Sequence, residues 1–192
     1  MVSYFLKQFW FIWLMLALSW VLLAHAELAS WNKHLIIEGE YWRVLSGNFC
    51  HNNLIHWLMN IATLTLIYFV YDDRLSNRHF LALSILLGLV GGLALLLAKY
   101  DEYVGLSGII HGLLAYAALI DLMKGKIKLG LIVLTGLGIK LVMEQISGGD
   151  PWVSEMIGID VATDAHLIFT LLGLTIALAV WCPLWNRQPL SS

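Results

Sequence analysis

Long apolar stretches separated by short polar segments make up most of the chain. Six of the stretches approach the roughly 20 residues that a helix needs to cross the hydrocarbon core of a bilayer. They cover residues 9–26, 54–71, 80–98, 104–122, 129–143 and 161–181. The fifth is the shortest and contains Lys140, so it is the weakest of the six. The pattern predicts an all-α membrane protein with six transmembrane helices, and we expect residues 1–192 to form a single domain.

Composition supports a membrane protein. Hydrophobic residues make up 60% of the 192 residues, charged residues only 12%, and the mean hydropathy is +0.79. A soluble domain of this size could not cover so much apolar side chain with so little charge. The net charge of −2 indicates no nucleic-acid partner. The longest connection, residues 27–53, mixes charge with Trp31, Tyr41 and Trp42, which predicts a structured loop at the membrane interface.

Basic residues are unevenly distributed between alternate connections, which predicts the orientation of the chain. If the amino terminus is cytoplasmic, the inner side carries Lys7, Arg74, Arg78, Lys124, Lys126, Lys128 and Arg187, and the outer loops carry only Lys33, Arg43 and Lys99. Residues 144–160 contain four acidic residues and no Lys or Arg. The positive-inside rule therefore predicts that both termini are cytoplasmic and that the loop 27–53 is outside.

The first apolar stretch has a second interpretation. Lys7, the apolar run and the segment Ala24-His25-Ala26 resemble a signal peptide with a small-residue cleavage site. The run is bulky and rich in tryptophan for that role, so we favour a retained helix.

Three of the predicted helices carry the polar side chains that peptide hydrolysis requires. His56 and Asn60 lie four residues apart at the start of the second helix and so share one face. Ser107 lies at the start of the fourth helix and His166 at the start of the sixth. Under the predicted topology all four lie in the outer half of the membrane. A serine nucleophile needs a base, for which His166 is best placed, and His56 and Asn60 can donate to an oxyanion.

Ordinary structural interpretations compete with this one. A membrane serine often bonds a carbonyl one turn back, and polar residues often bond between helices. Gly105 and Gly108 favour catalysis because they expose the helix start and its free N–H groups beside Ser107. His111 competes with His166 as the base, but it lies one turn deeper, and we expect it to pack below the site, against the base.

Lys140 and Glu144 lie four residues apart near the outer end of the fifth helix. This spacing favours a mutual ion pair. The alternative is a gate or a substrate contact beside the active site. Neither Asp160 nor Asp164 is an obvious third member of a catalytic triad.

Together these motifs resemble those of the rhomboid intramembrane serine proteases. The matching segments are Gly105-Leu106-Ser107-Gly108 for G-x-S-G, His56 to Asn60 for H-x-x-x-N, Trp42-Arg43 for the W-R pair of the first loop, Ala165-His166 for the A-H of the sixth helix, and His51 for a histidine often found before the second helix. The resemblance covers residues 42–173. It implies a six-helix rhomboid-like bundle, a Ser107–His166 dyad, an oxyanion site formed by His56 and Asn60, and no metal or cofactor.

The chain departs from the family pattern at two positions. Phe169 stands where the family often has a glycine, which predicts a looser or differently rotated contact between the fourth and sixth helices, although Gly173 is kept one turn on. His111 stands where the family often has an aromatic residue stacked on the catalytic histidine.

Within the family the sequence looks most like the rhombosortase branch, on the strength of residues 105–112 and 160–166. That resemblance implies a bacterial inner-membrane enzyme whose active site faces the periplasm. The implied partners are exported proteins anchored by a carboxy-terminal transmembrane helix that follows a Gly-Gly motif.

Two other functions remain as alternatives. A haem-binding membrane redox protein could use His56, His111 and His166 as ligands, although that role needs neither Ser107 nor Asn60. An inactive rhomboid-like protein could instead bind membrane clients, although it would not need to keep both the serine and His166.

Overall fold

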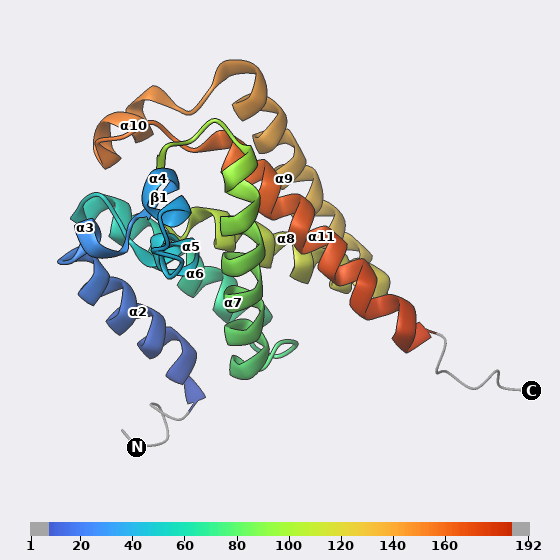
Figure 1. Ribbon diagram of the computed structural model, residues 1–192. Helices are drawn as coiled ribbons and strands as arrows, with labels where there is room; N and C mark the ends of the chain where they lie inside the picture. The colour runs from blue at the N-terminus through green and yellow to red at the C-terminus, as the bar shows by residue number, and fades with distance from the viewer. Residues whose placement is uncertain (1–7, 186–192) are drawn as a thin grey trace, which may run out of the picture.

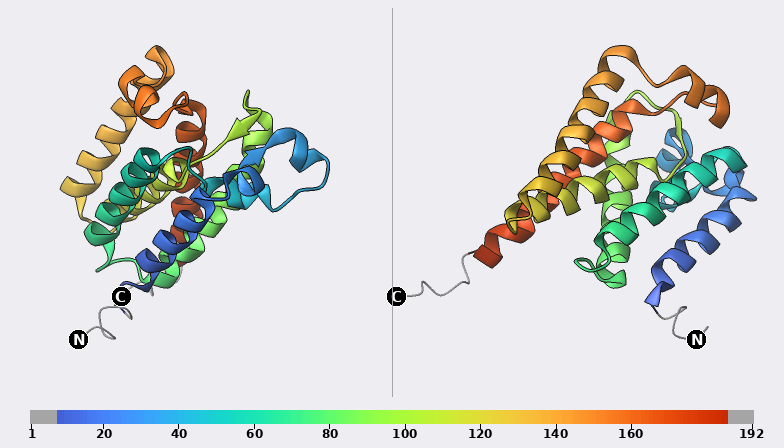
Figure 2. Two further views of the ribbon diagram at one scale, coloured as in Figure 1. Left: turned by 90° about the vertical axis from the view of Figure 1, so that its left-hand side faces the viewer. Right: turned by 180° about the vertical axis from the view of Figure 1, so that it is seen from behind.

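Helices occupy all six apolar stretches in the computed structural model, which describes residues 8–185 (Figure 1). They are α2 (Trp10–Leu23), α6 (Leu54–Tyr71), α7 (Asn77–Ala94), α8 (Ser107–Met123), α9 (Ile127–Ser147) and α11 (Thr163–Trp185). Successive helices run in opposite directions, so the start of α2 and the end of α11 lie at the same end of the bundle (Figures 1 and 2). The predicted all-α membrane fold is confirmed.

Four of these helices, α6, α7 with its extension, α9 and α11, are long and apolar enough to cross a membrane, whereas α2 and α8 are shorter. Helix α8 contacts α6, α7, α9 and α11, and Figure 2 shows it enclosed by them. Most of its 17 residues are buried. In contrast, only 17% of the apolar window of α9 is buried within the protein. The short α8 thus forms the centre of the bundle, and α9 lies at its edge.

Two helix limits differ informatively from those expected. Helix α8 begins at Ser107 rather than at residue 104, because Tyr103 belongs to a strand and Gly105 has a φ of +126°, a value that no helix accommodates. Helix α9 runs on to Ser147, well past residue 143, and ends at Gly148, whose φ is +77°. Lys140 does not interrupt α9 because its side chain is partly exposed and its ammonium group pairs with Glu144.

The loop between α2 and α6 is folded, as its aromatic residues predict. It contains α3 (Ala26–Ala29), β1 (Trp31–Asn32), α4 (Lys33–Ile37), α5 (Arg43–Ser46) and the 3₁₀ turn η1 (Gly47–Phe49). The buried Arg43 donates to the carbonyl oxygens of Ser30 at 2.8 Å and Glu27 at 3.1 Å, and to Glu40 Oε2 at 2.6 Å. These bonds close the loop around one guanidinium group.

Three more short elements lie between the later helices, and one of them pairs with this loop. They are η2 (Leu95–Leu97), β2 (Glu102–Tyr103) and α10 (Pro151–Ile157). Strands β1 and β2 pair antiparallel, with Trp31 opposite Tyr103. The indole Nε1 of Trp31 donates to the carbonyl oxygen of Gly92 in α7 at 2.8 Å. The loop is therefore fastened to both the segment before α8 and the helix beside it.

Helices α8 and α11 cross at a pair of glycines. A Cβ on Gly173 would lie 2.1 Å from the carbonyl oxygen of Gly112, so no other residue fits there without moving a helix. Phe169 is fully buried, and its ring fills space beside Gly91 and Gly108, where an added Cβ would lie 2.3 Å and 2.9 Å from the ring. The expected looser contact is therefore wrong, because two glycines accommodate the phenylalanine.

Candidate active site

The turn that leads into α8 determines where Ser107 lies. The N–H of Gly105 donates to the carbonyl oxygen of Gly47 at 3.2 Å, and the Tyr103 hydroxyl donates to the carbonyl oxygen of Gly105 at 2.8 Å. Only glycine adopts the positive φ of residue 105 without strain. This fixed turn places Ser107 at the first position of a helix that starts among the other helices, with N–H groups that lack intrahelical partners.

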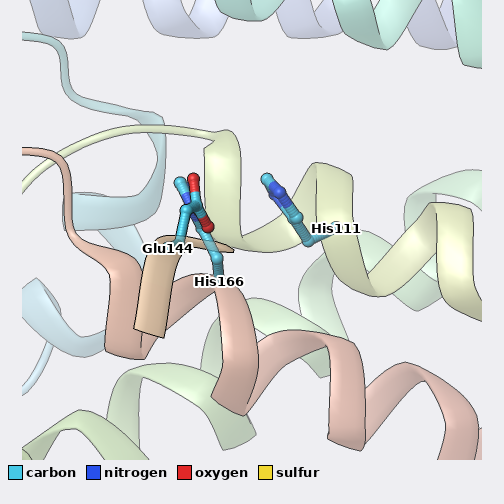
Figure 3. Close-up of side chains that lie close together, drawn as sticks. All are labelled: His111, Glu144 and His166. Atoms are coloured by element: carbon cyan, nitrogen blue, oxygen red, sulfur yellow. The ribbon is translucent and has the colours of Figure 1, made fainter. Parts of the chain in front are cut away.

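His166 reaches Ser107 from the first turn of α11. Its Nε2 lies 3.0 Å from Ser107 Oγ, and its ring is almost completely buried. On the other side of the ring, His166 Nδ1 lies 2.9 Å from Glu144 Oε2, which comes from α9 (Figure 3). The second carboxylate oxygen of Glu144 pairs with Lys140. Three helices thus contribute one continuous line of hydrogen bonds from a hydroxyl to a carboxylate.

His111 lies against His166 but points elsewhere. The two rings stack with 4.0 Å between their centroids and 13° between their planes (Figure 3). His111 Nδ1 lies 2.7 Å from the carbonyl oxygen of Ser107, and because a carbonyl only accepts, this nitrogen carries the proton. His111 therefore bonds the backbone of the serine while His166 bonds its hydroxyl.

His56 and Asn60 converge on the same turn from α6. Both are buried, and the point where a Cβ of Gly105 would lie is 2.8 Å from His56 Nε2 and 3.6 Å from Asn60 Nδ2. Among the described residues, Asn60 Nδ2 and His56 Nδ1 have no hydrogen-bond partner. The Asn60 amide nitrogen is a donor, and a buried donor without a partner is costly, so this group is available to an incoming acceptor.

His51 stands behind His56, with 5.0 Å between the ring centroids and an angle of 82° between the ring planes. Burial lowers the pKa of His51 to about 3, with a further contribution from the positive charge that His56 can carry. His51 is therefore neutral at physiological pH and supports the His56 ring by edge-to-face packing rather than by charge.

The cluster does not have the geometry of a metal or haem site. His111, Glu144 and His166 offer potential ligand atoms within 4.8 Å of one another. However, the lone pairs of an imidazole lie in the plane of its ring, and two parallel, stacked rings cannot direct their lone pairs at one ion between them. The same parallel arrangement does not suit a pair of axial haem ligands, which must face the iron from opposite sides.

Sequence reasoning missed two contacts between α9 and α11 that the structure reveals. The ion pair of Lys140 with Glu144 was expected from their spacing, but the bond from Glu144 to His166 was not. A second contact lies beside it, where Gln145 Nε2 donates to the carbonyl oxygen of Thr163 at 3.2 Å. Both join the end of α9 to the start of α11. The only signal in the sequence for the contact with His166 was a carboxylate at the end of an apolar stretch.

Comparison with known proteins shows the family of the chain. The Rhomboid domain family matches residues 38–182. The chain is similar to the proteins named Rhomboid protease GlpG from Salmonella newport, Salmonella typhi and Salmonella typhimurium, with 23% identity over 150 residues in each case. The match covers 77% of this chain and 51% of each relative, so the chain spans about half the length of the curated relatives it matches. The family match covers most of this chain, and four of its helices are long and apolar enough to cross a bilayer. The chain therefore belongs to the rhomboid family and is a multi-pass integral membrane protein.

Proposed function

We propose that this protein is an intramembrane serine endopeptidase in which Ser107 is the nucleophile and His166 the general base. One observation carries the proposal: Ser107 Oγ lies 3.0 Å from the Nε2 of a buried histidine, at the start of a helix in the interior of a membrane bundle. A serine that only bonded its own helix would not need a histidine from α11. His111 is not the base in this proposal, because its Nδ1 bonds the Ser107 carbonyl oxygen.

The reaction would proceed by acyl transfer. Ser107 Oγ attacks the scissile carbonyl carbon while its proton passes to His166 Nε2, and His166 then gives that proton to the leaving amine. Water, activated in the same way, hydrolyses the resulting acyl-enzyme. The unpaired amide of Asn60, the ring of His56 and the N–H of Ser107 would donate to the oxyanion.

We propose that the site opens toward the periplasm of a bacterial inner membrane and that both termini are cytoplasmic. Arg74 and Lys126, which follow α6 and α8, both pair with Asp73, so these basic residues gather at one end of the bundle. The start of α2 and the end of α11 lie at this end as well (Figure 1). Ser107 and His166 lie at the beginnings of helices that run toward it. Lys7 and Arg187, which also count among the basic residues of the predicted inner side, lie outside the described residues.

The substrates we propose are exported proteins held by one carboxy-terminal transmembrane helix behind a Gly-Gly motif, as for rhombosortases. A scissile bond must leave its helix before Ser107 can attack it, and each glycine lowers helix stability by ~1 kcal/mol relative to alanine. On the enzyme side, Gly105 leaves His56 and Asn60 close to the backbone beside Ser107. This crowding favours small substrate residues next to the scissile bond.

A fluorophosphonate probe tests the catalytic assignment without knowledge of the substrate. Detergent-solubilised wild-type protein should be labelled on Ser107, and Ser107→Ala and His166→Ala should each lose labelling while they keep the wild-type melting temperature. An inactive rhomboid-like protein that only binds clients would not be labelled at all. A haem protein would show a Soret band after purification.

A pair of reporters tests the substrate class. One reporter carries a Gly-Gly segment before a single carboxy-terminal transmembrane helix and a basic end, and the other has both glycines replaced by leucine. Only the first should be cleaved and released on the outer side. Equal cleavage of the two would remove the rhombosortase assignment and leave a general rhomboid protease.

A further inference from the structure

The end of α9 places a carboxylate in contact with the catalytic histidine. Glu144 Oε2 lies 2.9 Å from His166 Nδ1, and the side chain of Glu144 is only 12% exposed. An ionised carboxylate can only accept, so the proton of this hydrogen bond is on Nδ1. In the neutral ring Nε2 is then unprotonated, and it faces Ser107 Oγ at 3.0 Å. The hydroxyl must donate to it, which is the arrangement a general base requires.

We propose that Glu144 is a positioning residue that acts through His166 and completes a Ser107–His166–Glu144 triad, so that the hydrolysis does not depend on a dyad alone. The inference rests on the proposed function. When Ser107 Oγ bonds to the scissile carbon, its proton moves to Nε2 and the ring becomes an imidazolium. Glu144 remains ionised, holds the Nδ1 proton and stabilises the new positive charge. The proton on Nε2 then leaves with the amine, and the ring is neutral again.

The His166 ring lies in surroundings where a positive charge needs a carboxylate partner. His166 is 5% exposed, and one face of its ring is covered by His111 at 4.0 Å. A positive charge formed in a buried, apolar place is costly unless an opposite charge and a hydrogen bond compensate it. Within the described residues, Glu144 is the acidic group bonded to this ring.

Lys140 helps to keep the Glu144 carboxylate ionised, but it does not explain why this carboxylate is so little exposed. It pairs with Glu144 Oε1, and this leaves Oε2 directed at His166. Lys140 is 46% exposed, so the ion pair alone contributes little stability and does not account for a nearly buried glutamate. The bond to the histidine does account for it.

The contact between Glu144 and His166 is one of several hydrogen bonds around the first turn of α11. The next residue, Gln145, donates from Nε2 to the carbonyl oxygen of Thr163 at 3.2 Å. At the same turn of α11, the N–H of Asp164 donates to the hydroxyl of Tyr100 at 3.0 Å. These bonds hold the first turn of α11 on both sides, and they offer a control that loosens the junction without touching His166.

The test measures how fast a fluorophosphonate probe labels Ser107, as a maximal rate (kinact) and a half-saturation concentration (KI). Glu144→Gln keeps the shape and a hydrogen-bond acceptor but removes the charge. It should lower kinact at least tenfold and up to roughly 10⁴-fold, the range seen for triad carboxylates elsewhere, with KI within about threefold of wild type. Glu144→Asp keeps the charge and should label faster than Glu144→Gln.

The matched control is Gln145→Ala, which breaks the neighbouring bond to Thr163 and should label within about threefold of wild type. A Glu144→Gln protein that labels like wild type, or that loses no more than Gln145→Ala, would overturn the triad. So would a change in KI alone. If Glu144→Gln does not fold, the double variant Lys140→Met/Glu144→Gln, in which no charge is left unpaired, takes its place with the same outcomes.

The same experiment separates this inference from the proposed function. If wild-type protein is labelled on Ser107 and His166→Ala is not, the proposed protease stands whatever Glu144→Gln does. If wild-type protein is not labelled, or is labelled equally in Ser107→Ala, the proposed function fails and the triad fails with it.

Discussion

Gly112 and Gly173 meet where α8 crosses α11, and this crossing sets the distance between Ser107 and His166. Replacing Gly173 by alanine therefore tests the site from a position outside it. In Gly173→Ala the added Cβ would start 2.1 Å from the carbonyl oxygen of Gly112, whereas real contacts are not shorter than 3.0 Å. The two helices must therefore separate by about 0.9 Å. Ser107 and His166 sit on these same helices, and the same displacement would lengthen their 3.0 Å hydrogen bond to almost 4 Å, beyond bonding range.

The expected consequence is a loss of reactivity larger than the loss of stability. A misplacement of about 1 Å costs roughly 10²-fold in rate, and overpacking a tight contact costs about 1–3 kcal/mol. Probe labelling of Ser107 should therefore slow by about two orders of magnitude, and the melting temperature should fall by several degrees. Both are measured on detergent-solubilised protein.

A second glycine provides the control. Gly136 lies in α9, where an added Cβ meets nothing within 4 Å, so Gly136→Ala should keep the wild-type labelling rate and gain up to ~1 kcal/mol of helix stability. Wild-type labelling by Gly173→Ala would refute the argument that this crossing sets the distance between Ser107 and His166. Equal losses in both alanine variants would refute it as well.

Further predictions follow from the other contacts of the site. His111→Phe should keep labelling within about tenfold of wild type, because the stack on the base survives and only the bond to a backbone carbonyl is lost; an unlabelled but folded variant would reassign the base. His56→Ala and Asn60→Ala should each lower kcat of reporter cleavage by roughly 10²–10³ with little change in KM, and a change confined to KM would contradict the oxyanion role. His51 has a pKa of about 3 in the fold against an ordinary 6.5, so the unfolded chain takes up its proton first as pH falls; the melting temperature should drop from pH 7 to pH 4, and less steeply in His51→Phe. Reporter domains fused after the last residue should be cytoplasmic, and periplasmic activity would invert the topology.

The sequence by itself was sufficient for whatever depends on neighbours along the chain. The apolar stretches located the six helices, since a helix in lipid must satisfy its backbone within one continuous apolar segment. The spacing of four residues placed His56 and Asn60 on one face, and paired Lys140 with Glu144. The glycines around Ser107 marked a helix start, although the helix begins only at Ser107, after strand β2 and the turn at Gly105.

Only the tertiary structure decided what depends on how the helices cross. Glu144 and His166 are 22 residues apart and belong to different helices, and nothing in the local pattern of either one specifies the other. The accommodation of Phe169 depends on Gly91, which lies 78 residues earlier in the chain. In a bilayer the apolar faces of helices resemble the lipid, so their periodicity does not select a partner. Close contacts of small residues set the crossings, and the crossings bring the serine, the histidine and the glutamate together.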